Sequence, residues 1–257
     1  MTDVSPGVAP EQLIDLVRRA PLSFVGTVTR VGGTSLAAFP ADARNERTAV
    51  VKVTEVLHAP QAFRQLAGSE VTVQLAPEEA PLAVGDTRAL FTRGLVYGEG
   101  LGLAEVARLP AEAVQGHVSL AATTADELPF SSVQRTIRNQ DIAAHAAEAD
   151  AVVIGAVVGL EDLGLPAYSE HAPLWWRATI DVSRVEAGPV TPGRTGVLYP
   201  RSQDVRWYRV PKPAPGQLGL WLLHDTSGDL AAQAPYRLLH PDDYQPVQKL
   251  AVLREGR

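Results

Sequence analysis

The sequence contains an internal repeat at a constant spacing, and this repeat limits the folds that the chain can adopt. Residues 24–28 read Phe-Val-Gly-Thr-Val, and residues 153–157, which lie 129 positions later, read Val-Ile-Gly-Ala-Val. The same spacing, without a gap, relates residues 49–56 to residues 178–185, which share an alternation of apolar and polar side chains. A repeat of this length defines the domain organisation before any single motif is interpreted. We therefore expect two copies of one fold, each of ordinary domain size.

Each copy is predicted to be one helix followed by five short strands. In the first copy, apolar residues recur at helical spacing after Pro10. Alternating apolar residues then predict strands over residues 22–31, 47–57, 71–75, 87–92 and 103–107. In the second copy, Ser131 and Gln134 form a capping box that opens a helix over residues 131–148. The strands expected after it cover residues 152–160, 175–185, 195–199, 218–223 and 236–239.

The chain divides into two predicted domains. Residues 1–112 hold the first helix and barrel, and residues 113–257 hold a linking helix, the second barrel and a C-terminal helix. Pro241, Asp242 and Asp243 are expected to start that last helix, because carboxylates are favoured in a first turn.

Five short strands cannot cover both of their faces as a flat sheet, whereas a closed barrel buries one face and removes most edges. We therefore predict a mostly β protein with two tandem five-stranded OB-like β-barrels, each preceded by an α-helix. A β-sandwich is the alternative, although an immunoglobulin-like sandwich needs seven strands per copy.

The apolar pattern of both copies resembles one family of small barrels. In the first copy the pattern consists of Val25, Val28, Val51, Val53, Val56, Val71, Val73, Gly85, Leu90 and Phe91. In the second copy it consists of Ile154, Val157, Ile180, Val182, Val185, Val197, Gly216 and Trp221. This pattern resembles the OB-fold domains of the netrin and tissue-inhibitor-of-metalloproteinase type. In that family a free N-terminal cysteine chelates the protease zinc and disulfides staple the barrel. This chain has no cysteine, so the resemblance implies the barrel topology and not metalloproteinase inhibition.

Composition excludes several classes of function. The net charge of −6 disfavours a nucleic-acid partner and an anionic membrane, since both attract a dense positive surface. The absence of cysteine excludes disulfides, thiol catalysis and cysteine-based zinc sites. The sequence contains no stretch of about 18 apolar residues, so no membrane span is predicted. Residues 1–6 do not have the pattern of a secretory signal. A cytoplasmic protein without a membrane partner is therefore expected.

The chain lacks the common catalytic motifs. It contains no Gly-x-Ser-x-Gly elbow, no Gly-x-x-x-x-Gly-Lys phosphate loop and no His-Glu-x-x-His zinc motif. Asp141 and His145 lie four apart on a predicted helix and could share a metal ion, but two ligands are too few. We interpret them as a solvated helix pair and predict no catalytic residue, no metal ion, no cofactor and no enzymatic activity. An enzyme would need a site assembled only in the fold, and its first candidates are Glu170, His171, His224 and Asp225.

The second copy carries a group of aromatic and arginine residues that the first copy lacks. This Trp/Arg set consists of Trp175, Arg177, Arg201, Arg206, Trp207, Tyr208 and Arg209. Arginine beside tryptophan or tyrosine is typical of protein recognition surfaces. In the alternative interpretation, these aromatics bury the interface between the barrels or cover a barrel end.

These residues lead to one main functional hypothesis. We predict a non-catalytic protein-binding or scaffold protein, whose Trp/Arg set contacts a protein partner or another copy of the chain. A single-stranded nucleic-acid-binding protein is the alternative, because OB barrels stack bases on aromatic side chains. The enzyme with a site assembled in the fold is the third hypothesis.

Overall fold

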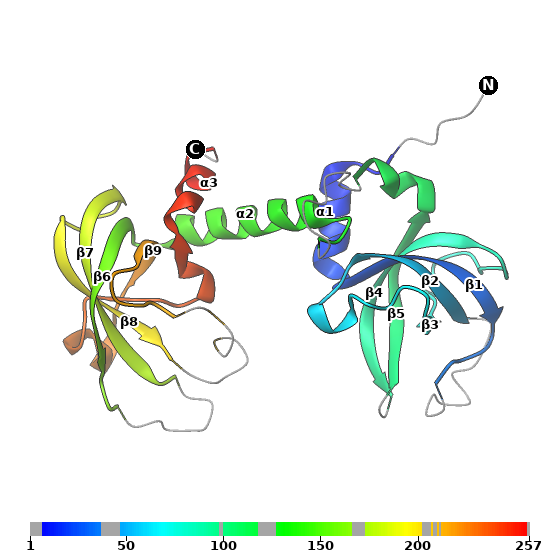
Figure 1. The fold of residues 1–257 in the computed structure, drawn as a ribbon, viewed down its shortest axis with the longest axis horizontal. Coiled ribbons are helices and arrows are strands. Elements are labelled where there is room, and N and C mark those ends of the chain that lie inside the picture. The colour runs from blue at the N-terminus through cyan, green and yellow to red at the C-terminus, as the bar shows by residue number, and fades with distance from the viewer. Residues whose placement is uncertain are drawn as a thin grey trace. The chain divides into compact units, whose positions relative to one another are not determined.

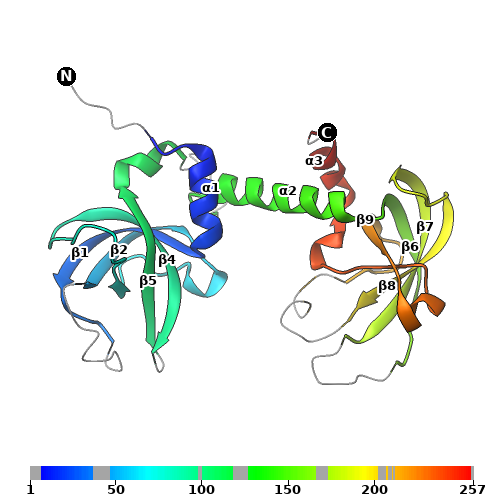
Figure 2. The same cartoon turned by 180° about the vertical axis from the view of Figure 1, so that it is seen from behind.

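The computed structural model describes residues 7–36, 47–97, 100–117, 127–165, 173–201, 207, 210 and 212–255. The chain forms two compact units, residues 1–138 and 139–257, and the division between them lies inside helix α2 (Ser131–Glu148). Figures 1 and 2 show the elements of each unit from two sides. Among the described residues, no helix is both long enough and apolar enough to cross a membrane.

The first unit is a closed barrel of five strands, as predicted. Helix α1 (Pro10–Arg19) precedes the strands, which are β1 (Leu22–Val31), β2 (Thr48–His58), β3 (Glu70–Gln74), β4 (Thr87–Tyr97) and β5 (Gly100–Pro110). Their order around the barrel is β1-β2-β3-β5-β4, and pairing between β4 and β1 closes it. Strands β3 and β5 run parallel, whereas the other neighbours are antiparallel.

The second unit repeats this arrangement. Its strands are β6 (Ala151–Asp162), β7 (Trp175–Ala187), β8 (Gly193–Pro200), β9 (Leu218–Asp225) and β10 (Tyr236–Arg237). They follow the order β10-β8-β7-β6-β9, and a further pairing between β10 and β9 closes the ring. The parallel pair is β8 with β10, which corresponds to β3 with β5. The prediction of two tandem five-stranded barrels, each preceded by a helix, is confirmed.

Each barrel has an inner core and a second core on its outside. In the first unit, helix α1 and the start of α2 cover the outer face of β4 and β5 through Leu13, Val17, Phe91, Phe130 and Val133. In the second unit, the end of α2 and helix α3 (Leu250–Glu255) cover the outer face of β6 and β9 through Ile142, Val152, Leu220, Leu222 and Leu253. Apolar residues on both faces of these strands are therefore buried.

The repeat extends to the strand register. In the first unit Phe24 pairs with Val56 and Val28 pairs with Val51. Adding 129 to each residue number gives the pairs observed between β6 and β7, and the three register irregularities recur at the same places. Side-chain hydrogen bonds recur as well: the Thr54 hydroxyl donates to the Val25 carbonyl at 2.9 Å, and the Ser183 hydroxyl donates to the Ile154 carbonyl at 3.3 Å. The two units are therefore structural copies of one another in detail.

A glycine is required where β1 meets β2, and again where β6 meets β7. A Cβ atom on Gly26 would lie 2.5 Å from Val51 Cγ1 and 3.0 Å from the carbonyl oxygen of Lys52. At the corresponding Gly155, a Cβ atom would lie 3.1 Å from the carbonyl oxygen of Asp181. The strands approach so closely here that only glycine fits without displacement.

The prediction that the C-terminal helix starts at Pro241 is wrong. Residues Pro241–Asp243 form one 3₁₀ turn, in which His240 and Asp243 make a capping box. The chain then forms strand β11 (Tyr244–Pro246), which pairs with β9, and α3 starts only at Leu250. The Asp243 carboxylate does take part in capping a helical turn, but the chain then pairs with β9 and the turn ends after three residues.

Candidate functional site

The structure separates the members of the Trp/Arg set. Trp207 is only 7% exposed and belongs to the inner core of the second barrel, where Lys212 Nζ lies 5.3 Å from its ring centroid. Arg206, Tyr208 and Arg209 lie outside the described residues. Trp175, Arg177 and Arg201 are described and lie at the ends of β7 and β8. The Trp207 side chain therefore packs within its own unit and does not form an exposed surface.

The end of β7 and β8 presents aromatic, apolar and cationic groups together. We call Leu174, Trp175, Trp176 and Arg201 the β7–β8 surface. The Arg201 guanidinium carbon lies 4.3 Å from the centroid of the Trp176 ring, which is a cation–π contact. The backbone N–H of Arg201 donates to the Leu174 carbonyl at 2.8 Å, which fixes this stack at the strand ends.

The parts of this surface differ in their exposure. Trp176 pairs with the buried Tyr199 and packs against the inner core, whereas Trp175 pairs with Pro200. Both tryptophans are partly exposed, Arg201 is exposed, and Leu174 is 45% exposed. Trp176 therefore helps to cover the end of the barrel, while Trp175 and Arg201 remain accessible at the surface.

Arg177 serves the fold of the second unit. Its Nη1 donates to the Gln233 carbonyl at 3.0 Å, and its Nη2 forms an ion pair with Glu161. These contacts tie β7 to β6 and to the segment after β9. Arg177 is accordingly a weaker candidate for partner binding than Arg201, whose ring contact leaves it exposed.

The first unit treats the equivalent positions differently. The repeat places Glu46 and Arg47 where the second unit has Trp175 and Trp176. Arg47 Nη1 donates to the carbonyl of Ala76 at 3.1 Å, so the first barrel has a hydrogen bond at the position where the second has Trp176. Because the shared fold does not require tryptophan here, the β7–β8 surface is a property of the second unit alone.

A second difference between the copies lies on β6 and β9. In the first unit, the hydroxyls of Thr27 and Thr87 are 2.8 Å apart and form a hydrogen bond. The second unit has Ala156 and Leu218 at these positions, and the Leu218 side chain is 48% exposed. Where the first unit has this pair of hydroxyls, the second unit therefore exposes an apolar side chain.

Of the four polar residues that sequence reasoning considered for catalysis, the structure describes His224 and Asp225. Glu170 and His171 are outside them, and the backbone N–H of Asp225 donates to Asp150 Oδ2 at 2.7 Å. His224 is mostly buried, and its Nε2 lies 3.4 Å from Asp243 Oδ2. The partner of His224 is thus a carboxylate that sequence reasoning assigned only to helix capping.

In the structure, His145 lies beside His240 and Asp242. The imidazole rings of His145 and His240 are stacked, with their centroids 4.2 Å apart. Among the described residues, His145, His240 and Asp242 are the group whose ligand atoms could hold a metal ion. Sequence reasoning paired His145 with Asp141 and missed His240, although His240 and the two carboxylates after it are a visible signal.

Burial shifts the pKa of several groups in both units. Burial raises the pKa of Glu105 above its ordinary value, and the backbone N–H of Ala76 and the Arg108 guanidinium oppose that shift. Burial, together with the charge of Arg64, lowers the pKa of His58. In the second unit burial raises the pKa of Tyr244 to about 12. Each of these groups lies within a core or at its edge, where desolvation disfavours the charged form.

Comparison with known proteins does not assign a family. The sequence matches no protein-family model, and it has no significant match among curated proteins.

Proposed function

We propose that the chain is a non-catalytic binding protein built on two OB-fold domains, and that the β7–β8 surface of the second domain contacts a protein partner. The observation that carries the proposal is the exposed Arg201 guanidinium stacked on Trp176 beside a partly exposed Trp175. Tryptophan and arginine are the residues most enriched where protein interfaces concentrate their binding energy. Leu174, 45% exposed, adds apolar area next to them.

The domain assignment has its own support. The first unit is a closed barrel in the order β1-β2-β3-β5-β4 with β3 parallel to β5, and β6-β7-β8-β10-β9 in the second unit is the same order with β8 parallel to β10. OB folds are five-stranded barrels of this size. The likeness to the netrin and tissue-inhibitor type stays a hypothesis about the barrels alone. A cytoplasmic location also stays a prediction.

Comparison of the two copies favours the β7–β8 surface as the binding site over surfaces that both copies share. Residues that both copies share build the barrel, as the repeated register and Gly26 with Gly155 show. Trp175 and Arg201, which only the second copy has, are exposed or partly exposed and are not among the shared barrel residues, so they are free to serve another purpose. The net charge of −6 favours a protein over a nucleic acid as the ligand.

The test compares the full chain with the double variant Trp175→Ala plus Arg201→Ala in affinity purification from the native host. Truncation of these residues is expected to weaken a specific complex by at least about thirtyfold, since truncating even one interface anchor costs about 2 kcal/mol. Arg194→Ala is the matched control, because Arg194 is an exposed arginine at the other end of β8. Identical partners for all three proteins would contradict the proposal.

Two further measurements separate the alternatives. Sedimentation equilibrium of the purified chain reveals whether the partner is a second copy, in which case the double variant has the lower mass. Fluorescence anisotropy with single-stranded oligonucleotides tests the nucleic-acid hypothesis, which requires binding that weakens steeply with added salt.

A further inference from the structure

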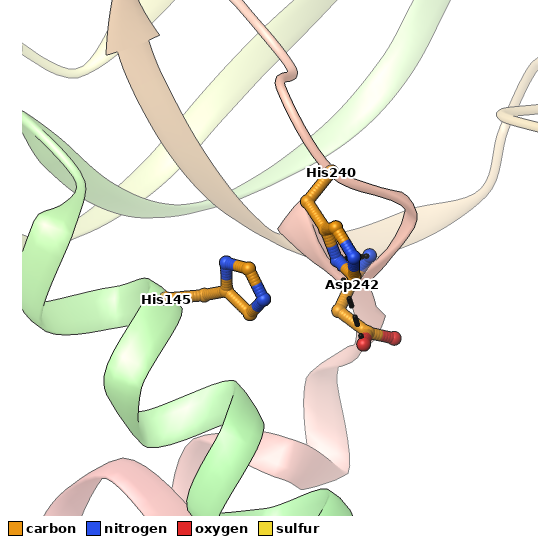
Figure 3. Close-up of side chains that lie close together, drawn as sticks. All are labelled: His145, His240 and Asp242. Atoms are coloured by element: carbon orange, nitrogen blue, oxygen red, sulfur yellow. Dashed lines mark hydrogen bonds and ion pairs between the residues drawn. The ribbon is translucent and has the colours of Figure 1, made fainter. Parts of the chain in front are cut away.

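Three metal-ligating side chains from two distant segments meet in the second unit. His145 lies on α2, and His240 and Asp242 lie at the 3₁₀ turn that follows β10. One ligand atom from each residue lies within 4.8 Å of the others. Figure 3 shows His145 facing His240 and Asp242. All three residues are partly exposed, so an ion from solution can reach them.

A buried carboxylate stands behind these side chains. Asp243 is fully buried, and its Oδ2 accepts hydrogen bonds from the backbone N–H groups of Leu239 at 2.7 Å and His240 at 2.6 Å. Its Oδ1 has no hydrogen-bond partner and lies 3.9 Å from His145 Nδ1. This distance is too long for a hydrogen bond, but a small rotation of His145 would let Asp243 accept its Nδ1–H and leave Nε2 for a metal, which is the usual second shell of such sites.

The carboxylate ligand is also held in place. Gln245 Nε2 donates to Asp242 Oδ1 at 3.2 Å and to the Asp242 carbonyl at 3.1 Å. Asp242 Oδ2 lies 3.6 Å from His240 Nδ1, so the carboxylate and the imidazole share one side of the turn. The backbone N–H of Asp242 also donates to His240 Nδ1 at 3.2 Å, which leaves Nε2 of that ring for a metal, so hydrogen bonds orient two of the three candidate ligands.

We propose that His145, His240 and Asp242 bind one divalent transition-metal ion of the Zn²⁺ class. Two imidazoles and one carboxylate form a donor set that suits Zn²⁺, Cu²⁺ or Ni²⁺. Ca²⁺ and Mg²⁺ fit poorly because they take oxygen ligands. This inference does not depend on the proposed partner binding, because it concerns different residues.

Binding requires one movement of a side chain. The stacked rings of His145 and His240 are inclined by 17°, so their in-plane lone pairs do not point at one common position. Zinc–nitrogen bonds of about 2.0–2.1 Å bring ligand atoms closer than the observed 4.8 Å limit. His145 is partly exposed and can rotate out of the stack. The bound ion would then join the end of α2 to the turn at Pro241.

The experiment titrates the tag-free full chain with Zn²⁺ alone, by calorimetry and by competition with a chromophoric chelator. We expect one strong site per chain, whose affinity falls at least about tenfold in His145→Ala and in Asp242→Asn. His117→Ala is the control, because it removes a histidine from the first unit and should bind like the wild type. Asp243→Asn is expected to bind about 10–100-fold more weakly, as removal of a second-shell carboxylate does.

Two results would overturn the proposal. The first is the absence of a one-to-one Zn²⁺ site in the wild type. The second is equal affinity in the wild type, His145→Ala and Asp242→Asn, with circular dichroism showing that all three are folded, since zinc would then bind elsewhere. A direct check of the ring movement is nuclear magnetic resonance, in which Zn²⁺ should shift the His145 and His240 ring signals together and leave that of His58 unchanged.

Discussion

The four tryptophans of the chain illustrate how position decides the role of a residue. Trp221 is fully buried, and its indole N–H donates to the Gly155 carbonyl at 3.0 Å. Trp207 is also in the inner core, Trp176 lines its edge, and Trp175 lies at the β7–β8 surface. The sequence distinguishes none of these environments, because Trp175 and Trp176 are adjacent and Trp207 lies in a segment rich in polar residues.

Removal of the Trp207 side chain should destabilise the second unit. Trp207→Ala deletes a core side chain that is 7% exposed, so we expect the free energy of unfolding to fall by about 3–5 kcal/mol. Urea unfolding measures it, and Trp175→Ala is the matched control, with a clearly smaller loss because Trp175 is partly exposed. Equal losses in the two variants would show that Trp207 is not a core residue.

Protonation of His58 should destabilise the first unit. His58 contacts Gln134 of α2, and burial lowers its pKa below the ordinary value of about 6.5. The neutral ring therefore contributes stability that is fully present above about pH 6.5 and is lost as the pH falls through the lowered pKa. Nuclear magnetic resonance titration should give a His58 midpoint below 6.5, and His58→Gln should reduce the loss of stability in acid. A midpoint above 6.5 would contradict this account.

At the scale of elements, the strands were predictable because their apolar residues alternate. Nine of the ten predicted barrel strands match observed strands and differ from them only at their ends. The tenth was predicted over residues 236–239 and is shorter, since β10 covers only Tyr236–Arg237. Strand β11 was missed, since three residues carry too little pattern and its partner β9 is distant in sequence. The neighbourhood of His145 was missed for the same reason, because His240 reaches it only through the fold.

The close approach of β1 and β2 gives a test of the repeated register. Gly26→Ala places a Cβ atom 3.0 Å from the Lys52 carbonyl oxygen, so we expect a loss of about 1–3 kcal/mol in unfolding free energy. Gly116→Ala is the control: a Cβ atom there meets nothing within 4 Å, and the change should stay within about 0.5 kcal/mol. Thermal unfolding of both variants measures the difference. A Gly26→Ala variant as stable as the control would contradict the described register.

At the scale of the whole molecule, the two copies divide the residues into those that build a barrel and those that do not. The shared residues include the turns at Gly85 and Gly216, whose backbone N–H groups bond to the carbonyls of Val28 and Val157 at 2.9 and 2.8 Å. The differing residues include Trp175, and Leu218 in place of Thr87. The repeat therefore predicted the architecture, whereas the exposure of each differing residue needed the structure.

The most direct test of the proposed function is photo-crosslinking inside the native host. Trp175→p-benzoylphenylalanine places a photoreactive ring at the β7–β8 surface, and the same replacement at Arg194 serves as the control. The account predicts a protein adduct of higher mass from position 175 that is absent from position 194. No adduct from position 175, or the same adducts from both positions, would contradict the claim that this surface binds a protein partner.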